Sequence, residues 1–430
     1  MKVLIIGGGG REHALVRAAR NSPLVKRVAC APGNGGIARE ADCPNLEIND
    51  TAAVVAYVRR NHVDLTIIGP EKPLTAGLAD HLEQEGFRVF GPSRAAAEIE
   101  SSKVFAKEFM ARHEIPTASF EIFSSARAAK DHLRHGPDHP LVVKADGLAS
   151  GKGVLVCDDR EQSLAAVNEI MEKGAYGEAG RQVVVEERLY GKELSLFALT
   201  DGSDMKILPT CRDYKRLEDG DRGPNTGGMG ALAPVPDCGE DLLREIEEKI
   251  LQPTLGGLAA EGRPFRGVLY AGLMLTPEGP KILEYNARFG DPETQILVPL
   301  LTSDLLEEMA SIAEGSLSRG EIDWHEGASV GVVASSEGYP GSPVVDLKIS
   351  GLDAAAAMEG VRIFHAATRR APRRTTFTTG GRVLCVVALG PDWAMARDRA
   401  YRALSHIQFE GMHHRSDIAS DMQQVTATGT

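Results

Sequence analysis

The first hundred residues alternate short apolar strands with helical stretches, and a glycine-bearing loop follows every strand. The predicted strands are Val3–Ile6, Arg27–Ala31, Leu65–Ile68 and Arg88–Phe90, and the loops after them begin GGGGR, PGNGG, GPE and GPS. Strands that alternate with helices favour a parallel sheet with helices on both faces. Ligands of such sheets bind outside the carboxyl ends of the strands, so the four loops predict a ligand site at one edge.

The first of these loops favours a phosphate site over a dinucleotide site. The GxGxxG pattern would need glycine at position 12 or 13, where Glu12 and His13 stand. A strand that runs through glycines into a helix still offers backbone N–H groups and a positive helix end to a phosphate. Arg11 would add a formal charge. We therefore expect a monophosphate here and disfavour a nicotinamide-dependent oxidoreductase.

A second glycine loop lies between two apolar strands in the segment VKADGLASGKGVLV, which begins at Val143. It is not a P-loop, because Asp146 replaces the first glycine and Gly153 replaces the Ser or Thr after the lysine. A strand–loop–strand flap can lie over a triphosphate, with backbone N–H groups and lysines as donors, although an ordinary hairpin with solvated lysines is the alternative. The stretch from about residue 116 to 185 reads as β-rich. Before it, Ser102 can cap a helix that carries Lys103 and Lys107 on one face.

The segment KILEYNARFGDPE, which begins at Lys281, indicates metal chemistry. In a strand from Lys281 to Arg288, a period of two places Glu284, Asn286 and Arg288 on one face. Carboxylate and carboxamide oxygens are ligands suited to Mg²⁺ that bridges phosphates, and Arg288 offers a planar fork to a carboxylate or phosphoryl group. The alternative is a solvated strand face with a local Glu–Arg pair.

A further loop, DGDRGPNTGGMG at residues 219–230, is too rich in glycine to pack by side chains. It offers many backbone donors, and Asp213, Lys215 and Arg216 lie just upstream. Such a loop can close over a substrate or remain an exposed connection.

The charge balance limits the partners of the chain. Among 430 residues, 48 basic against 60 acidic side chains give a net charge of −12, which argues against nucleic-acid and anionic-membrane binding. The N-terminus lacks a signal-peptide pattern, no long apolar run occurs, and six cysteines are scattered. We expect a cytoplasmic protein of two to four domains, since a single core rarely exceeds about 250–300 residues.

Six motifs, in their order along the chain, resemble those of the phosphoribosylamine–glycine ligase (glycinamide ribonucleotide synthetase) family of ATP-grasp enzymes. They are GGGGREHA, APGNGG, IGPEKPL, VKADGLASGKGV, DGDRGPNTGGMG and NARFGDPETQ. The resemblance implies an α/β chain with an ATP-grasp fold: an N-terminal parallel-sheet domain, an ATP-grasp unit with a mobile lid subdomain, and a C-terminal mixed α/β cap. The expected bounds are 1–101, 102–325 with the lid at about 118–190, and 326–425.

The resemblance also implies a reaction of purine synthesis, in which ATP drives the ligation of glycine to 5-phosphoribosylamine. The glycine carboxylate would attack the γ-phosphate to give glycyl phosphate, and the amine of phosphoribosylamine would then displace phosphate. The protein would act by positioning and by charge stabilisation, with Mg²⁺ or Mn²⁺ as the metal.

The family's residue roles carry over to matching positions of this chain. The implied ATP contacts are Lys103, Lys144, Gly151, Lys152, Gly153, Glu186, Leu189 and Glu193. The implied metal ligands are Glu284 and Asn286. The implied contacts to glycine and phosphoribosylamine are Gly10, Arg11, Asn34, Glu71, Asp213, Lys215, Asn225, Thr226, Gly227, Gly228, Arg288 and Asp291. The expected catalytic residues are Arg288, Lys144 and Asp291.

Three alternative functions remain open: another ATP-grasp ligase or carboxylase with a phosphoribosyl acceptor, a nicotinamide oxidoreductase, and a non-catalytic nucleotide sensor. The NTGGMG and RFGDPE segments favour the glycine ligase over the first. One departure concerns the strand before the metal pair, YAGLML from Tyr270, which lacks the additional metal-binding acid of many ATP-grasp enzymes. We expect a monomer, with no further purine-pathway enzyme in these 430 residues.

Overall fold

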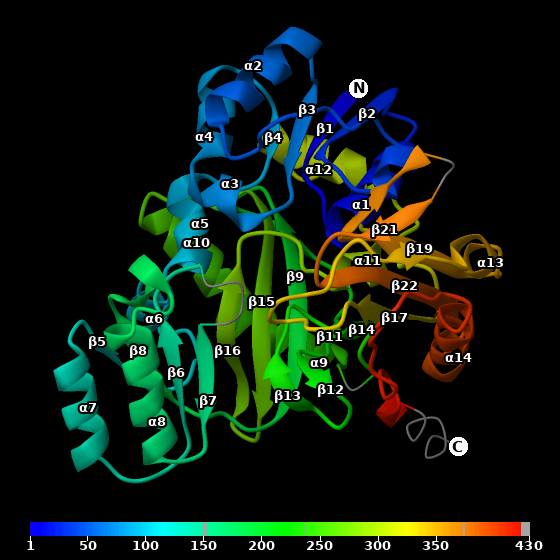
Figure 1. Cartoon of the computed structure of the whole chain (residues 1–430). Coiled ribbons are helices and arrows are strands. Elements are labelled where there is room, and N and C mark those ends of the chain that lie inside the picture. The colour runs from blue at the N-terminus through cyan, green and yellow to red at the C-terminus, as the bar shows by residue number, and fades with distance from the viewer. Residues whose placement is uncertain (149–152, 237, 373–374, 423–430) are drawn as a thin grey trace.

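The computed structural model describes residues 1–148, 153–236, 238–372 and 375–422 (Figure 1). Its N-terminal part contains a parallel sheet in the order β2-β1-β3-β4. The strands are β1 (Lys2–Gly7), β2 (Arg27–Pro32), β3 (Leu65–Ile68) and β4 (Val89–Phe90). Each prediction for these four strands is confirmed to within one residue at either end. The predicted ATP contacts Gly151 and Lys152 lie outside the described residues.

Six helical segments accompany this sheet, and capping explains where several begin. The Asp50 carboxylate accepts from the Ala53 N–H, and the Ser93 hydroxyl accepts from the Ala96 N–H, so each satisfies a helix-end donor. The segments are α1 (Gly10–Asn21), η1 (Ile37–Arg39), α2 (Thr51–Asn61), α3 (Glu71–Thr75), α4 (Leu78–Gln84) and α5 (Arg94–Ser101). Because the strands run parallel, the four glycine-bearing loops share one edge of the sheet, as the sequence predicts.

The central part is built on an antiparallel sheet in the order β10-β9-β15-β16. The strands are β9 (Lys192–Thr200), β10 (Met205–Ile207), β15 (Gly267–Thr276) and β16 (Gly279–Asn286). The helical segments are α6 (Lys103–Arg112), α9 (Glu240–Ile246), η4 (Glu247–Leu251), α10 (Gln252–Ala260), α11 (Glu293–Leu297), η5 (Val298–Leu300) and α12 (Leu305–Ala313). Ser102 caps α6 by accepting from the Phe105 N–H, as predicted.

A separate antiparallel sheet, in the order β5-β8-β6-β7, lies within residues 118–190. Its elements are β5 (Phe120–Phe123), α7 (Ala126–His135), β6 (Leu141–Ala145), β7 (Val154–Cys157), α8 (Arg160–Val167), η2 (Asn168–Glu172), η3 (Gly177–Gly180) and β8 (Val183–Glu187). The expectation of a β-rich stretch is therefore wrong in part. Leu133 of α7 and Ala166 of α8 pack with Val143 and Val185 in a small core of their own, so the strands need these helices to cover one face.

The C-terminal sheet runs in the order β11-β14-β17-β22-β19 and crosses the expected boundary at residue 325. Its strands are β11 (Arg212–Asp213), β14 (Gly230–Ala233), β17 (Ala328–Ser335), β19 (Val361–His365) and β22 (Arg382–Gly390). The remaining elements are β12 (Arg216–Glu218), β13 (Arg222–Asn225), β18 (Lys348–Ile349), α13 (Leu352–Ala356), β20 (Thr368–Arg370), β21 (Thr376–Thr378) and α14 (Trp393–Leu404). Since β14 hydrogen-bonds to β17, the glycine-rich loop before β14 is anchored to the C-terminal part.

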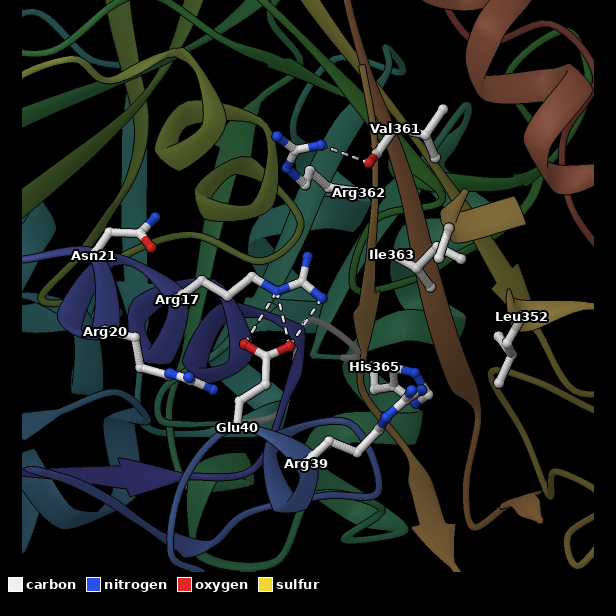
Figure 2. A pocket seen from close by; sticks show the side chains of 11 residues that line it. Arg17, Arg20, Asn21, Arg39, Glu40, Leu352, Val361, Arg362, Ile363 and His365 are labelled. Carbon is white, nitrogen blue, oxygen red and sulfur yellow. Dashed lines mark hydrogen bonds and ion pairs between the residues drawn. The ribbon is translucent and has the colours of Figure 1, made fainter. Parts of the chain in front are cut away.

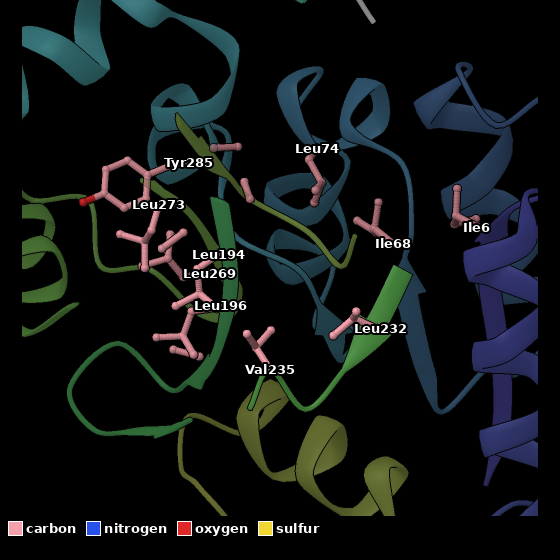
Figure 3. Packing of buried hydrophobic residues seen from close by; sticks show 14 of the residues in the cluster. Ile6, Ile68, Leu74, Leu194, Leu196, Leu232, Val235, Leu269, Leu273 and Tyr285 are labelled. Carbon is pink, nitrogen blue, oxygen red and sulfur yellow. The ribbon is translucent and has the colours of Figure 1, made fainter. Parts of the chain in front are cut away.

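Two hydrophobic clusters outside the lid region each join the three parts, and Figure 3 draws residues of the larger one. Figure 3 shows Ile6 and Ile68 of the N-terminal sheet, Leu196 and Leu269 of the central sheet and Leu232 of the C-terminal sheet within this cluster. The lid region has a separate core, which permits it to move as a unit. No helix among the described residues has both the length and the apolar character needed to cross a membrane.

Candidate active site

The first glycine loop is packed too closely for larger residues. A Cβ atom on Gly8 would lie 2.5 Å from the Gly33 carbonyl oxygen, and one on Gly10 would lie 2.4 Å from Gln295 Nε2. The predicted contact Gly10 therefore begins α1 where the N-terminal sheet meets α11. The backbone can approach a ligand here because no side chain intervenes.

The N-terminus of α1 is occupied by carboxylates of the protein itself, which alters the predicted phosphate site. Glu12 Oε2 accepts from the Gly9 N–H at 2.6 Å, and Glu12 Oε1 accepts from Arg11 Nε at 2.6 Å. Arg11 also donates to the Phe289 carbonyl at 3.1 Å and is buried. The positive helix end and the guanidinium are thus already partly neutralised. A phosphate would compete with Glu12 for the Gly9 N–H and for Arg11. The sequence pattern does not indicate these partners of Glu12.

Asn34 links three segments of the chain. Its side-chain oxygen accepts from the Gly36 and Ile37 N–H groups, both at 2.9 Å. Its amide donates to the Gly8 carbonyl at 2.9 Å and to the His365 carbonyl at 2.8 Å. The predicted substrate contact is therefore a bracing residue, which holds two glycine loops against the C-terminal β19.

Three lysines and one glutamate form a buried cluster between α6 and the lid sheet. Glu186 pairs with Lys107, with 2.5 Å between Oε2 and Nζ, and also with Lys144. Lys144 donates to the Leu283 carbonyl at 3.0 Å, and Lys103 donates to the Gly147 carbonyl at 2.9 Å. Burial raises the pKa of Glu186, but Lys144 and Lys107 more than offset this, so its pKa is lowered. The Glu186 carboxylate is thus paired with two lysines of the cluster.

The other predicted ATP residues extend from this cluster. Gly153 accepts from the Ala145 N–H at 2.8 Å and so closes the base of the glycine loop. Leu189 is half-buried just beyond β8. Glu193 lies at the start of β9, where Oε2 is 3.1 Å from Lys215 Nζ.

The predicted metal pair lies at the end of β16. Glu284 and Asn286 share one face of the strand because they are two residues apart. Burial raises the pKa of Glu284, but four nearby cations lower it by more, so the net shift is downward. These cations are Lys215, Lys144, Lys103 and Arg288. Glu284 is therefore an ionised oxygen donor at neutral pH.

Arg288 follows the end of β16, and its guanidinium is held by groups of both N-terminal and central parts. Nη2 donates to Asn286 Oδ1 at 3.0 Å and lies 3.1 Å from Glu100 Oε1, while Nη1 donates to the Phe289 carbonyl at 3.1 Å. Glu71 Oε2 lies 3.9 Å from Arg288 Nε. The structure thus brings the predicted residues Glu71, Asn286 and Arg288 together. Glu100, in α5, has no sequence motif to mark it.

Asp291 connects the segment after β16 to the N-terminal helix α1 and to the C-terminal sheet. Its Oδ1 accepts from Gln295 Nε2 at 2.7 Å and lies 3.4 Å from Arg382 Nη1. Burial raises the pKa of Asp291, but Arg382, Arg11 and a hydrogen bond from the Arg11 backbone lower it. Arg382 also donates to the carbonyls of Gly227 at 2.5 Å and Asp291 at 2.6 Å. It comes from β22 and was not found from the sequence.

The loop of residues 225–228 is fixed both by its backbone, since the Thr226 N–H donates to the Lys215 carbonyl at 2.8 Å, and by the Thr226 hydroxyl. Thr226 donates its hydroxyl to the Lys215 carbonyl at 2.8 Å and accepts from the Gly228 N–H at 3.0 Å. Asn225 ends β13 opposite Arg216. Near this loop, burial raises the pKa of Asp213 to about 8, although Lys215 opposes the shift. The loop region is therefore close to the acids that surround Lys215.

The lysine cluster and the glycine loops thus lie on either side of one short segment, residues 284–291. Lys103 and Lys144 lower the pKa of Glu284, whereas Arg11 and Arg382 lower the pKa of Asp291. Arg288 lies within this segment, between the two charged groups.

Comparison with known proteins shows the family of the chain. Residues 1–100, 101–294 and 329–421 match the N, ATP-grasp (A) and C domains of phosphoribosylglycinamide synthetase. The chain is 46% identical to phosphoribosylamine–glycine ligase of Caldanaerobacter subterraneus subsp. tengcongensis, over 98% of this chain and all of that one. It is 47% identical to the trifunctional purine biosynthetic protein adenosine-3 of Gallus gallus, over 97% of this chain and 42% of that one.

Solved structures give the same result at the level of the fold. A crystal structure of phosphoribosylamine–glycine ligase from Thermotoga maritima matches 97% of this chain and all of that one, with a TM-score of 0.83 and 36% identity. The biotin carboxylase of Campylobacter jejuni matches 96% of this chain and 92% of that one, with a TM-score of 0.73 and 16% identity, which is a likeness of fold alone. The chain belongs to the phosphoribosylglycinamide synthetase, or phosphoribosylamine–glycine ligase, family of ATP-grasp enzymes.

Proposed function

We propose that this ligase activates glycine as glycyl phosphate and then transfers the glycyl group to the amine of 5-phosphoribosylamine. Its overall activity is the family's ATP-dependent synthesis of glycinamide ribonucleotide in purine biosynthesis. A free carboxylate is a poor acyl donor, so the γ-phosphate of ATP supplies the leaving group. One observation carries the proposed route: Glu284, Asn286, Arg288 and Asp291 lie in one segment between the lysine cluster and the glycine loops.

In the proposed first step, a glycine carboxylate oxygen bonds to the γ-phosphorus while the bond from that phosphorus to the bridging oxygen of ADP breaks. Lys103 and Lys144 would hold the phosphates, and Arg288 would orient the carboxylate. The Arg288 side chain remains about one-fifth exposed, and its Nε has no hydrogen-bond partner among the described residues, so the guanidinium retains a donor for a ligand. Fixed charges of this kind stabilise a developing phosphoryl charge without reorganisation.

A divalent cation fits the donor set of β16. Glu284 is ionised, Asn286 offers a carboxamide oxygen, and no group of three His, Cys, Asp or Glu side chains able to hold a metal occurs in the described part of the chain. A site with few protein ligands suits Mg²⁺ or Mn²⁺ shared with substrate phosphates. When bound, the ion would offset phosphate charge. For Asn286 Oδ1 to bind the ion, Arg288 Nη2 must give up its hydrogen bond to this oxygen or share the oxygen with the ion.

In the proposed second step, the amine nitrogen bonds to the carbonyl carbon of glycyl phosphate, and phosphate leaves with the former carboxylate oxygen. The proton that the nitrogen loses goes to the departing phosphate. Gly10, Arg11, Asn34 and Glu71 would border phosphoribosylamine, with Asn34 acting by bracing the loops. Asp291 and the loop of residues 225–228 would border the reacting carbonyl. Asp291 is suited to orient the amine, because Arg382 and Arg11 keep its carboxyl ionised.

Oxygen labelling tests this route directly. With glycine that carries ¹⁸O in its carboxylate, one labelled oxygen should appear in the released phosphate, and ADP release should require glycine, phosphoribosylamine and a divalent cation together. Unlabelled phosphate would exclude the glycyl phosphate route. Full activity with bicarbonate in place of glycine would contradict the substrate assignment itself and favour a carboxylase.

A further inference from the structure

A pocket of about 500 Å³ lies between α1, η1, α13 and β19, apart from the segment that carries the proposed chemistry (Figure 2). Four arginines line it, Arg17, Arg20, Arg39 and Arg362, and Glu40 is the one acidic residue in its lining among the described residues. None of these five residues belongs to the site described above. The pocket is within the size range of small-ligand sites, about 300–1,000 Å³.

Two of the arginines already have acidic partners. Arg17 donates to Glu40 Oε1 from Nε at 3.1 Å and from Nη2 at 3.0 Å. Arg39 lies 3.8 Å from Asp353, and both of these side chains are at least half exposed, so that pair is weak. The Arg17–Glu40 pair therefore leaves most of the positive charge in the pocket uncompensated.

The other two arginines are available to a ligand. Neither Arg20 nor Arg362 forms an ion pair within the described residues, and the Arg362 guanidinium donates only to the carbonyl of its neighbour Val361, at 2.9 Å. Like charges gathered in a concave site attract anions and repel one another until an anion binds. Arginine's planar fork suits phosphate oxygens in particular.

The accessible apolar side of the pocket is formed by α13, through the half-buried Leu352 and the exposed Ala356. Val361 and Ile363 of β19 also line the pocket, but they are only 2% and 5% exposed and pack in the core. Figure 2 shows Leu352 across from Arg17 and Arg20 of α1. A purely inorganic anion would leave this apolar side without a contact, whereas a nucleotide can place its base or sugar there.

We propose that this pocket binds a nucleotide, whose phosphates contact Arg20, Arg39 and Arg362 and whose base and sugar lie against the apolar side. The pocket is joined to the glycine loops by short contacts. Glu40, which holds Arg17, also lies 3.2 Å from His13 Nε2, and His13 Nδ1 accepts from the His365 N–H at 2.8 Å. The bound nucleotide therefore lies beside the residues that brace the loops.

Equilibrium dialysis with labelled ADP and Mg²⁺ tests the proposal on the full chain. The wild type should bind two molecules of ADP per chain, one at the ATP-grasp site and one in the pocket. The Arg20→Ala/Arg362→Ala variant should lose the second, because each charge-assisted contact removed weakens binding about tenfold or more. Both residues are exposed, so the variant should fold; circular dichroism and thermal unfolding verify this. Arg127→Ala, an exposed arginine of α7, is the matched control and should keep both.

The Lys103→Ala variant separates this proposal from the proposed function, because it should weaken the ATP-grasp site and leave the pocket site. A wild-type stoichiometry of one, or an unchanged stoichiometry in the double-arginine variant, would overturn the proposal. A competition experiment with inorganic pyrophosphate tests the contribution of the base. Displacement of the pocket ADP by an equal concentration of pyrophosphate would show that the base adds nothing to the affinity, and would refute a nucleotide as the occupant.

Discussion

Replacing Arg382 by alanine should disable the enzyme although this residue comes from the C-terminal sheet. Its Nη1 donates to the Gly227 carbonyl at 2.5 Å and the Asp291 carbonyl at 2.6 Å, and lies 3.4 Å from Asp291 Oδ1. The side chain is about four-fifths buried. Arg382 thus fastens the glycine-rich loop to the segment that carries Asp291.

The expected magnitude follows from these contacts. A hydrogen bond from a charged donor contributes about 1.5–3 kcal/mol, so the loss of two, partly replaced by water, should lower the free energy of unfolding by about 2–4 kcal/mol. A loop displaced by about 1 Å can cost roughly 10²-fold in rate. We therefore expect kcat/KM for glycine to fall about 10²-fold, which corresponds to about 2.7 kcal/mol.

Steady-state ADP release and urea unfolding measure the two effects separately. Arg382→Lys should recover part of the activity, since one charged donor can still reach a carbonyl. Arg402→Ala, which removes an exposed ion pair of α14, should leave both activity and stability near the wild type. If Arg382→Ala loses stability but keeps kcat/KM within about threefold of the wild type, the residue does not position the loop and the reasoning fails.

Three other expectations follow from the same site. Glu284→Gln should lower kcat about 10²-fold, because it removes the ionised donor of the proposed metal pair; activity unchanged across a titration of Mg²⁺ would contradict this. Glu186→Gln should lower the free energy of unfolding by about 3–5 kcal/mol, because it leaves Lys107 and Lys144 buried without their anion. Urea titrations measure this, with Glu169→Gln, at an exposed ion pair of η2, as the control variant. Burial, with His13 and Arg17, lowers the pKa of His365 to about 3. Between about pH 6.5 and 3 the unfolded chain therefore binds a proton that the folded chain does not. The free energy of unfolding should fall as the pH is lowered through this range, by up to about 1.4 kcal/mol per pH unit. In His365→Gln the same titration should be flatter, and an identical slope would show that His365 is not the group responsible.

The parts of the fold that depend on local pattern could be predicted from the sequence. The strand bounds of the N-terminal sheet follow from short apolar runs that end in glycine, and the shared face of Glu284 and Asn286 follows from the two-residue period of a strand. Arg288 lies beyond the end of β16, so its place beside Asn286 comes from the hydrogen bond between them rather than from that period. The helices of the lid region were missed because the apolar runs around them read as strands.

Contacts between distant segments could not be predicted from local pattern. Arg382 meets Asp291 across 91 residues, and Glu100 receives the Ala287 N–H across 187 residues. Neither Arg382 nor Glu100 stands in a motif, and each acquires its partner only when the sheets pack. The carboxylates at the N-terminus of α1 could not be predicted for a different reason. A glycine loop before a helix predicts backbone N–H donors, but it does not indicate which acidic side chain will accept their hydrogen bonds.

The charge of the lysine cluster gives a physical reason for the proposed divalent cation, even though several lysines are gathered there. Lys103, Lys107 and Lys144 face Glu186 and Glu284, so the cluster carries a net charge of only about +1 before a ligand arrives. The triphosphate of ATP carries several negative charges and cannot be balanced by that remainder in a buried site. Glu186 neutralises lysines that would otherwise repel one another, which keeps them close together without ATP. In the proposed mechanism, an ion that binds with the nucleotide would supply the missing positive charge. The acidic balance of the chain, −12 overall, would then be compatible with an anionic substrate, because positive charge would enter the site together with it.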